Sequence, residues 1–87
     1  MSLAQLTYFV AVAEEQHLTR AASKLHISQP PLTRQIKELE AELGVALFSR
    51  TRHGMSLLPA GEALLSRARQ ILELVELTRQ DARTWGQ

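Results

Sequence analysis

The sequence lacks cysteine altogether, and it has only one tryptophan, one tyrosine and two phenylalanines. The absence of cysteine excludes disulfides and thiolate metal sites. The three histidines, His17, His26 and His53, do not have the spacing of metal ligands, so neither a metal nor another cofactor is expected in this chain. No stretch approaches the roughly 20 apolar residues of a membrane span. A basic leader followed by an apolar block is also lacking, which predicts a cytoplasmic protein without membrane contact.

The sequence also lacks a large excess of charge of one sign, because its formal net charge is only +1. The distribution of the charge is more informative than its sum. Residues 1–15 carry −2 and residues 55–87 carry 0, whereas residues 16–54 hold six basic and three acidic side chains, a net +3. The middle of the chain is therefore the candidate for contact with an anionic partner. A solvated surface often shows a similar excess, so this signal alone is weak.

The sequence is rich in helical periodicity. With 87 residues and 45% hydrophobic content, the chain is sufficient for one small domain. Residues 2–15 repeat apolar side chains at helical spacing, and a second apolar row predicts a second packing partner for this helix. Residues 18–25 predict a short second helix, and residues 26–28 predict a tight connection after it.

A third helix is predicted over residues 29–43, with clear start and stop signals. Ser28 is a preferred N-cap residue, and any phosphate contact of its hydroxyl comes second to that role. Pro30 and Pro31 fit a first helical turn, where backbone N–H groups have no intrahelical partner. Gly44 provides the C-terminal stop.

Two short β-competent runs follow, at residues 47–50 and 56–58. The polar segment 51–55 between them predicts a small hairpin with a basic tip. A long helix then begins at Pro59 and runs to about Trp85. A heptad seam along it predicts that two copies pair there, and Leu65 and Leu72 are predicted to return to the domain's own core. The seam consists of Leu64, Ala68, Ile71, Val75, Thr78, Ala82 and Trp85.

Two short helices joined by a tight turn are typical of a helix-turn-helix, whose second helix enters the major groove of DNA. The predicted outer positions of the third helix are Gln29, Pro30, Thr33, Arg34 and Lys37. Glutamine can bind adenine through two hydrogen bonds, arginine can bind guanine in the same way, and threonine offers a hydroxyl and a methyl group. The two prolines leave a helix tip that can approach the groove floor closely.

The sequence also bears on two other classes of function, a protein-interaction module and an enzyme. A protein-interaction module would favour an acidic or apolar outer face, which this helix lacks. An enzyme needs a nucleophile and base, or paired carboxylates, in a cleft. Glu38, Glu40 and Glu42 lie on one helix without a nearby histidine, so no enzymatic activity is expected. For Trp85, packing in the dimer or against a missing segment is favoured over base stacking.

The run from Ala21 to Glu40 resembles the N-terminal signature of LysR-type transcriptional regulators, as do the run from Leu43 to Arg50 and Pro59-Ala60-Gly61. The resemblance spans essentially the whole chain in register. It implies a mainly α winged helix-turn-helix over residues 1–58 and a linker and dimerisation helix over residues 59–87. It also implies a bacterial regulator that binds interrupted palindromes in double-stranded operator DNA as a homodimer, with a tetramer for the full-length protein. Family members sense a small-molecule effector in a C-terminal domain, which is expected to be missing here.

Position by position, the resemblance assigns base reading to Gln29, Pro30, Pro31, Thr33 and Arg34. It assigns contacts with the backbone or through the wing (about residues 50–55) to Thr19, Lys24, Ser28, Lys37, Arg50, Arg52 and His53. Two positions depart from the family pattern. His17 replaces the usual serine and Leu58 the usual threonine, both at N-cap positions, so a loss of about 0.5–2 kcal/mol of local stability is expected at each. Pro59 in the first helical turn is expected to offset part of the second loss.

Overall fold

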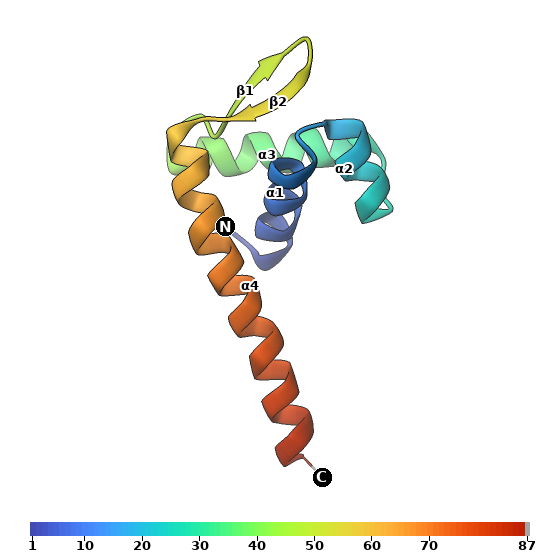
Figure 1. Ribbon diagram of the computed structural model, residues 1–87, viewed down its shortest axis with the longest axis vertical. Coiled ribbons are helices and arrows are strands. Elements are labelled where there is room, and N and C mark those ends of the chain that lie inside the picture. Colours follow the sequence, from blue (N-terminus) through green and yellow to red (C-terminus); the bar gives the residue numbers. More distant parts are fainter. Residues whose placement is uncertain (87) are drawn as a thin grey trace.

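Four helices and one antiparallel hairpin make up the computed structural model, which describes residues 1–86 (Figure 1). The predicted second and third helices are confirmed at the expected bounds. The first helix begins one residue later than predicted, and the long helix begins and ends as predicted. The elements are α1 (Leu3–Glu15), α2 (Leu18–Leu25), α3 (Gln29–Leu43), β1 (Phe48–Thr51), β2 (Gly54–Leu57) and α4 (Pro59–Trp85).

Helix α1 begins after a capping box. The hydroxyl of Ser2 accepts the backbone N–H of Gln5 at 3.0 Å, and the side chain of Gln5 accepts the backbone N–H of Ser2 at 3.3 Å. These bonds satisfy two backbone donors that the first turn otherwise leaves unpaired. The start of α1 is therefore set by residues 2–5 themselves.

The core lies where α1 packs against α2, α3 and the first half of α4. Phe9 of α1 is fully buried and meets Phe48 of β1, with ring centroids 5.4 Å apart. Leu32 and Leu39 of α3 are also fully buried, on the face opposite the polar one. Burial of this apolar stripe fixes which face of α3 is left to solvent.

The loop of the hairpin is shorter than predicted. Thr51 and Gly54, placed in the loop by the sequence, pair with one another at the end of the strands, and Phe48 pairs with Leu57 at the other end. The hydroxyl of Thr51 accepts the N–H of His53 and donates to the carbonyl of Gly54, both at 3.2 Å. Gly54 has φ +130°, a conformation that side chains rarely adopt. These local bonds extend the ladder into the predicted loop.

Helix α4 starts against the core and then leaves it (Figure 1). A Cβ atom on Gly61 would lie 2.3 Å from the carbonyl oxygen of Leu47, so only glycine allows this close start. Leu65 and Leu72 pack against the core, as predicted. Beyond Leu72 the helix projects away from the other elements, and the molecule measures 51 × 26 × 19 Å. No helix among residues 1–86 is both long and apolar enough to cross a membrane.

Candidate nucleic-acid interface

The turn between α2 and α3 is closed by backbone hydrogen bonds. His26 ends α2 in the left-handed conformation, with φ +59°, and its N–H bonds to the carbonyl of Ser23 at 3.1 Å. The N–H of Ile27 bonds to the carbonyl of Ala22 at 3.0 Å, and the Ile27 side chain packs against the core. The predicted role of His26 as a turn residue is confirmed. Two helices joined in this way form a helix-turn-helix.

Ser28 occupies the N-cap position of α3, but its side chain makes no capping hydrogen bond. The expectation that its hydroxyl caps the helix is therefore wrong. An N-cap side chain accepts from the second or third backbone N–H of the helix. In α3 these positions are Pro30 and Pro31, which have no N–H to donate. The exposed Ser28 hydroxyl is left without this bond.

The outer face of α3 forms one wall of an open depression. Its lining comprises Gln29, Pro30, Thr33, Arg34, Lys37, Glu38, Ala41 and, from the hairpin, Arg50. Four of the five predicted base-reading residues are therefore brought together. The fifth, Pro31, is half-buried and lies outside this lining.

A second depression separates the hairpin from the start of α2. It is lined by His17, Leu18, Thr19, Gln29 and residues 50–55. Because both depressions contain Gln29 and Arg50, they form one continuous surface. We call it the basic surface, made of Thr19, Gln29, Thr33, Arg34, Lys37, Arg50, Arg52 and His53. Among the lining residues of the two depressions, Glu38 is the sole acid.

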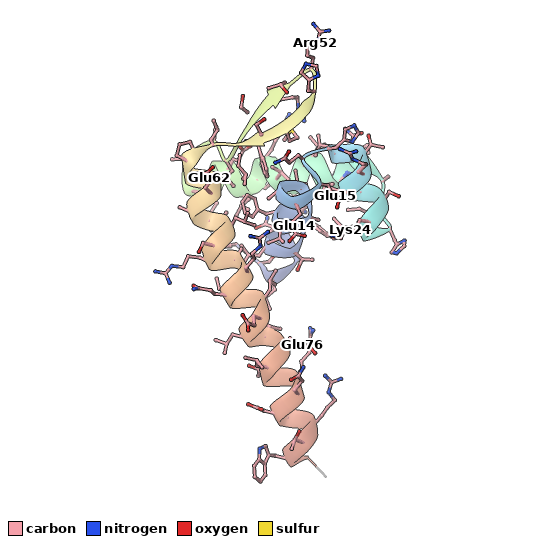
Figure 2. The ribbon with its side chains drawn as sticks, viewed as in Figure 1. Glu14, Glu15, Lys24, Arg52, Glu62 and Glu76 are labelled. Carbon is pink, nitrogen blue, oxygen red and sulfur yellow. The ribbon has the colours of Figure 1, made fainter. Side chains whose placement is uncertain are left out.

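The hairpin is fastened to the turn between α1 and α2. The N–H of Met55 bonds to the carbonyl of Gln16 at 3.0 Å. A Cβ atom on Gly54 would lie 2.3 Å from the same carbonyl oxygen, so glycine is required for this approach. The anchored hairpin holds Arg52 at its far tip, opposite the C-terminal end of α4 (Figure 2).

Glu40 has a structural role that the sequence did not reveal. Its Oε2 atom accepts the backbone N–H of Leu47 at 2.7 Å and that of Phe48 at 3.4 Å. The carboxylate thereby ties the start of β1 to α3. This bond fixes the hairpin relative to the outer face of α3, and no sequence pattern marked it because its partners are backbone groups seven and eight residues away.

His17 caps α2, contrary to the expectation of a lost cap. Its Nδ1 atom accepts the backbone N–H of Arg20 at 3.3 Å. An imidazole nitrogen here replaces the hydroxyl oxygen of serine. His17 also lines the second depression, and it was not among the predicted contacts with DNA. The expectation at Leu58 differs in outcome, since no side-chain cap is present there and Pro59 occupies the first turn.

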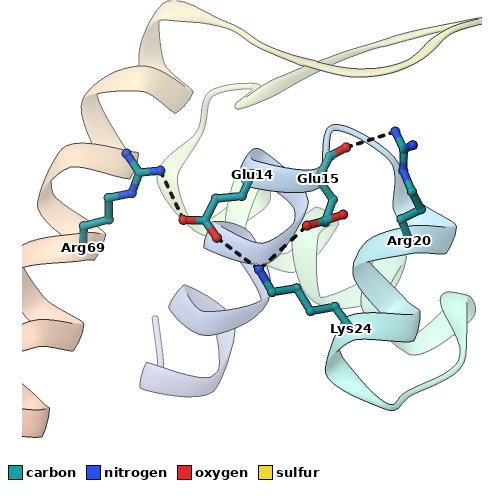
Figure 3. Close-up of polar contacts among 5 residues, drawn as sticks. All are labelled: Glu14, Glu15, Arg20, Lys24 and Arg69. Carbon is teal, nitrogen blue, oxygen red and sulfur yellow. Dashed lines mark hydrogen bonds and ion pairs between the residues drawn. The ribbon is translucent and has the colours of Figure 1, made fainter.

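Lys24 lies apart from the basic surface. Its Nζ atom is 3.4 Å from a carboxylate oxygen of Glu14 and 3.7 Å from one of Glu15, both at the end of α1 (Figure 3). Glu14 also pairs with Arg69 of α4 at 3.2 Å. Lys24 therefore joins a charge network that links α2, α1 and α4. The structure does not bring it together with the other predicted backbone contacts.

The predicted heptad seam on α4 is only partly free. Ala68 is fully buried in the core of its own chain, so its place in an exposed seam is wrong. The helix meets α1 on that side, and periodicity alone cannot tell an internal contact from an external one. Leu64 is half-buried against the same core, and Val75 is half-buried. The exposed members are Ile71, Thr78, Ala82 and Trp85.

Two exposed leucines on α4 lie outside the predicted seam. Leu74 is 64% exposed and Leu77 is 47% exposed. Together with Ile71 and Trp85 they make the outer half of α4 unusually apolar for a surface helix. Their spacing could have been found in the sequence as an alternative apolar row beside the predicted one.

A closed helix-turn-helix, an anchored hairpin and a cationic surface between them define a winged helix-turn-helix DNA-binding domain. The chain belongs to the lysR family of bacterial regulatory helix-turn-helix proteins, whose family model matches residues 3–62. The predicted fold class and family are thereby confirmed.

Named relatives agree with this assignment. The transcriptional regulator ClcR of Pseudomonas putida is 52% identical over 83 residues, which cover 95% of this chain and 28% of ClcR. BsdA of Bacillus subtilis is 51% identical over 77 residues, covering 87% of this chain and 27% of BsdA. The chain thus spans about a quarter to a third of these relatives' length. Both are named as HTH-type transcriptional regulators.

Solved structures give the same result. The crystal structure of the CbnR_DBD-DNA complex matches with a TM-score of 0.95 and 47% identity, over 100% of both chains. The crystal structure of the BenM_DBD/catB site 1 DNA complex matches with a TM-score of 0.96 and 42% identity, over 99% of this chain and 97% of the other.

Proposed function

We propose that this chain binds double-stranded operator DNA sequence-specifically, with α3 in the major groove and the hairpin on the backbone and minor groove. The observation that carries the proposal is the continuous basic surface, which joins the outer face of α3 to the hairpin through Gln29 and Arg50. The likeness to the CbnR and BenM complexes with DNA supports this placement.

We assign two kinds of contact to the basic surface and to the residues beside it at the start of α3. Gln29, Thr33 and Arg34, on the outer face of α3, read base edges, while Pro30 and Pro31 keep the helix tip slim. Lys37, Arg50, Arg52, His53 and the hydroxyls of Thr19 and Ser28 contact phosphates or the minor groove. Phosphate contacts supply salt-dependent affinity, and base contacts supply specificity. Lys24 is left out because it pairs with Glu14 and Glu15.

We further propose a homodimer formed through the exposed part of α4, which places two copies of α3 on a dyad-symmetric site. Ile71, Thr78, Ala82 and Trp85 form its centre, and Leu74 and Leu77 extend it. Residues 1–58 then form the DNA-binding unit and residues 59–87 the linker. Because the chain spans 28% of ClcR, we propose that it is part of a longer regulator. For that regulator we propose a cytoplasmic location, an effector-binding domain and assembly as a tetramer, which membership of the lysR family implies.

The test starts with selection of bound sequences from random duplexes, which reports the half-site and its spacing. Arg34→Ala should then weaken binding to the selected duplex by about 1–3 kcal/mol per subunit contact, with little change on a scrambled duplex. Arg79→Ala, in the exposed half of α4, is the matched control and should bind as the unmodified chain does. Equal losses on both duplexes would make Arg34 a phosphate contact.

Arg52→Ala sharpens the assignment of the hairpin. Because Arg52 lies at the hairpin tip, its loss should weaken binding to all duplexes alike and reduce the slope of log K against log salt by about 1. Binding titrations at several salt concentrations measure this slope. An unchanged slope would remove the hairpin from the interface.

A further inference from the structure

A hydrogen bond within the basic surface links α2 to α3. Thr19 is the second residue of α2 and Gln29 the first of α3, and the helix-turn-helix brings them together. The Thr19 Oγ1 atom donates to the Gln29 Oε1 atom at 3.2 Å. Both residues are exposed and both line the second depression. Among residues 1–86 this is the one side-chain hydrogen bond between the two helices.

The bond restrains a side chain that is otherwise mobile. A glutamine side chain loses much of its rotamer entropy when it is fixed. A partner that holds it before binding reduces the cost of ordering it on the ligand. Among residues 1–86, Thr19 provides the only hydrogen bond to the Gln29 side chain, so the restraint comes from Thr19 alone.

The orientation of the Gln29 amide leaves both its donor group and its acceptor atom available to a base. With Oε1 directed at Thr19, the Nε2 group keeps both N–H donors free. The Oε1 atom has two lone pairs, so it can accept a second hydrogen bond while it keeps the first. A glutamine needs one donor and one acceptor to bind an adenine edge through two hydrogen bonds.

We propose that Thr19 is a positioning residue that sharpens base recognition by Gln29, rather than only a phosphate contact. The inference rests on the proposed function. A phosphate contact from the Thr19 hydroxyl would raise affinity for every sequence equally. A positioning role acts through Gln29, so it alters the preference at the base pair that Gln29 contacts.

The experiment compares two substitutions of Thr19. Thr19→Val keeps the branched shape and removes the hydroxyl, while Thr19→Ser keeps the hydroxyl. The measured quantity is the Kd for a duplex altered at the base pair whose preference Gln29→Ala abolishes, divided by the Kd for the selected duplex. Thr19→Val should lower this ratio by about three- to tenfold, the factor that one hydrogen bond contributes. Thr19→Ser should leave it near that of the unmodified chain.

A second arm places Thr19→Val in the Gln29→Ala background, where it should leave the ratio unchanged. Thermal unfolding of each variant checks that the fold is retained. A uniform loss of affinity with the ratio intact overturns the inference and leaves Thr19 as a phosphate contact. So does an equal effect of Thr19→Val in both backgrounds. A selection with the unmodified chain that returns no preferred sequence contradicts the proposed function itself.

Discussion

The two ends of the molecule use apolar residues in opposite ways. In the head, residues 1–72, apolar side chains from every element form one core, and Phe9, Leu32 and Leu39 are fully buried. In the tail, residues 73–86, no described residue is buried, and Leu74 and Leu77 face solvent. An isolated helix of that length is marginal in water. The contrast teaches that the head is held together by its own contacts, whereas the tail is covered by no other part of its own chain and is left open to the proposed second copy.

The largest expected effect is the difference in stability between a leucine-to-alanine substitution in the head and one in the tail. Leu32→Ala removes a fully buried side chain from the head and should lower the free energy of unfolding by about 2–5 kcal/mol. Leu74→Ala, in the tail, should change it by less than about 0.5 kcal/mol at concentrations where the chain is monomeric. Urea unfolding followed by circular dichroism measures both. Equal losses would show that the tail is part of the same cooperative unit.

A charge on the solvent-facing side of α4 should act on association instead of folding. Ile71→Asp places a carboxylate on the exposed apolar face of α4, where dimerisation would have to desolvate it, and should weaken the dimer by at least about 100-fold. Sedimentation at matched concentrations measures the oligomeric state. Ser66→Asp, an exposed position of α4 outside the predicted seam, is the control and should remain dimeric. If Ile71→Asp also remains dimeric, the interface lies elsewhere.

The third comparison uses two carboxylates. Glu40→Ala removes the acceptor for the N–H groups of Leu47 and Phe48 in the head, and should cost about 1–3 kcal/mol of stability. Glu76→Ala removes exposed pairs with Arg79 and Arg83 in the tail and should cost under about 1 kcal/mol. Thermal unfolding ranks them. Glu40→Gln keeps one acceptor oxygen, so its stability should fall between those of Glu40→Ala and the unmodified chain. If Glu40→Ala does not change the stability, the hydrogen bonds of Glu40 are dispensable.

The smallest effect is expected at the exposed ion pair between α1 and α4. The Arg69 and Glu14 side chains pair at 3.2 Å but are 55% and 37% exposed. Arg69→Ala should therefore cost about 0.2–1 kcal/mol, and less at high salt. A double-mutant cycle with Glu14→Ala isolates the pair, and Arg67→Ala on the same helix is the control. A coupling energy above this range would make the pair a principal link between α1 and α4.

Sequence reasoning succeeded where the deciding interactions are local. Helix bounds follow from caps, prolines and glycines within a few residues, so α2 and α3 lie where they were predicted. The outward side chains of α3 follow from its apolar stripe at Leu32, Ile36 and Leu39. The missing cap of Ser28 was also within reach, because Pro30 and Pro31 lack the N–H groups that a cap requires.

Sequence reasoning failed where a residue's partner is distant or is a backbone atom. The role of Glu40 depends on N–H groups that β1 brings to it, and that of Lys24 on carboxylates of α1. His17 caps α2 only because its ring is oriented so that Nδ1 accepts the N–H of Arg20. These assignments need the three-dimensional arrangement of the elements.

The sequence by itself determined the helices, the family and the cationic character of the middle of the chain, since each follows from side chains read along one element. The tertiary structure alone decided which apolar residues of α4 remain free. Ala68 and Ile71 occupy the same heptad row, yet Ala68 is fully buried in the core and Ile71 is 38% exposed. The reason is geometric. A helix repeats its faces along its whole length, whereas a small core covers only the turns that lie beside it.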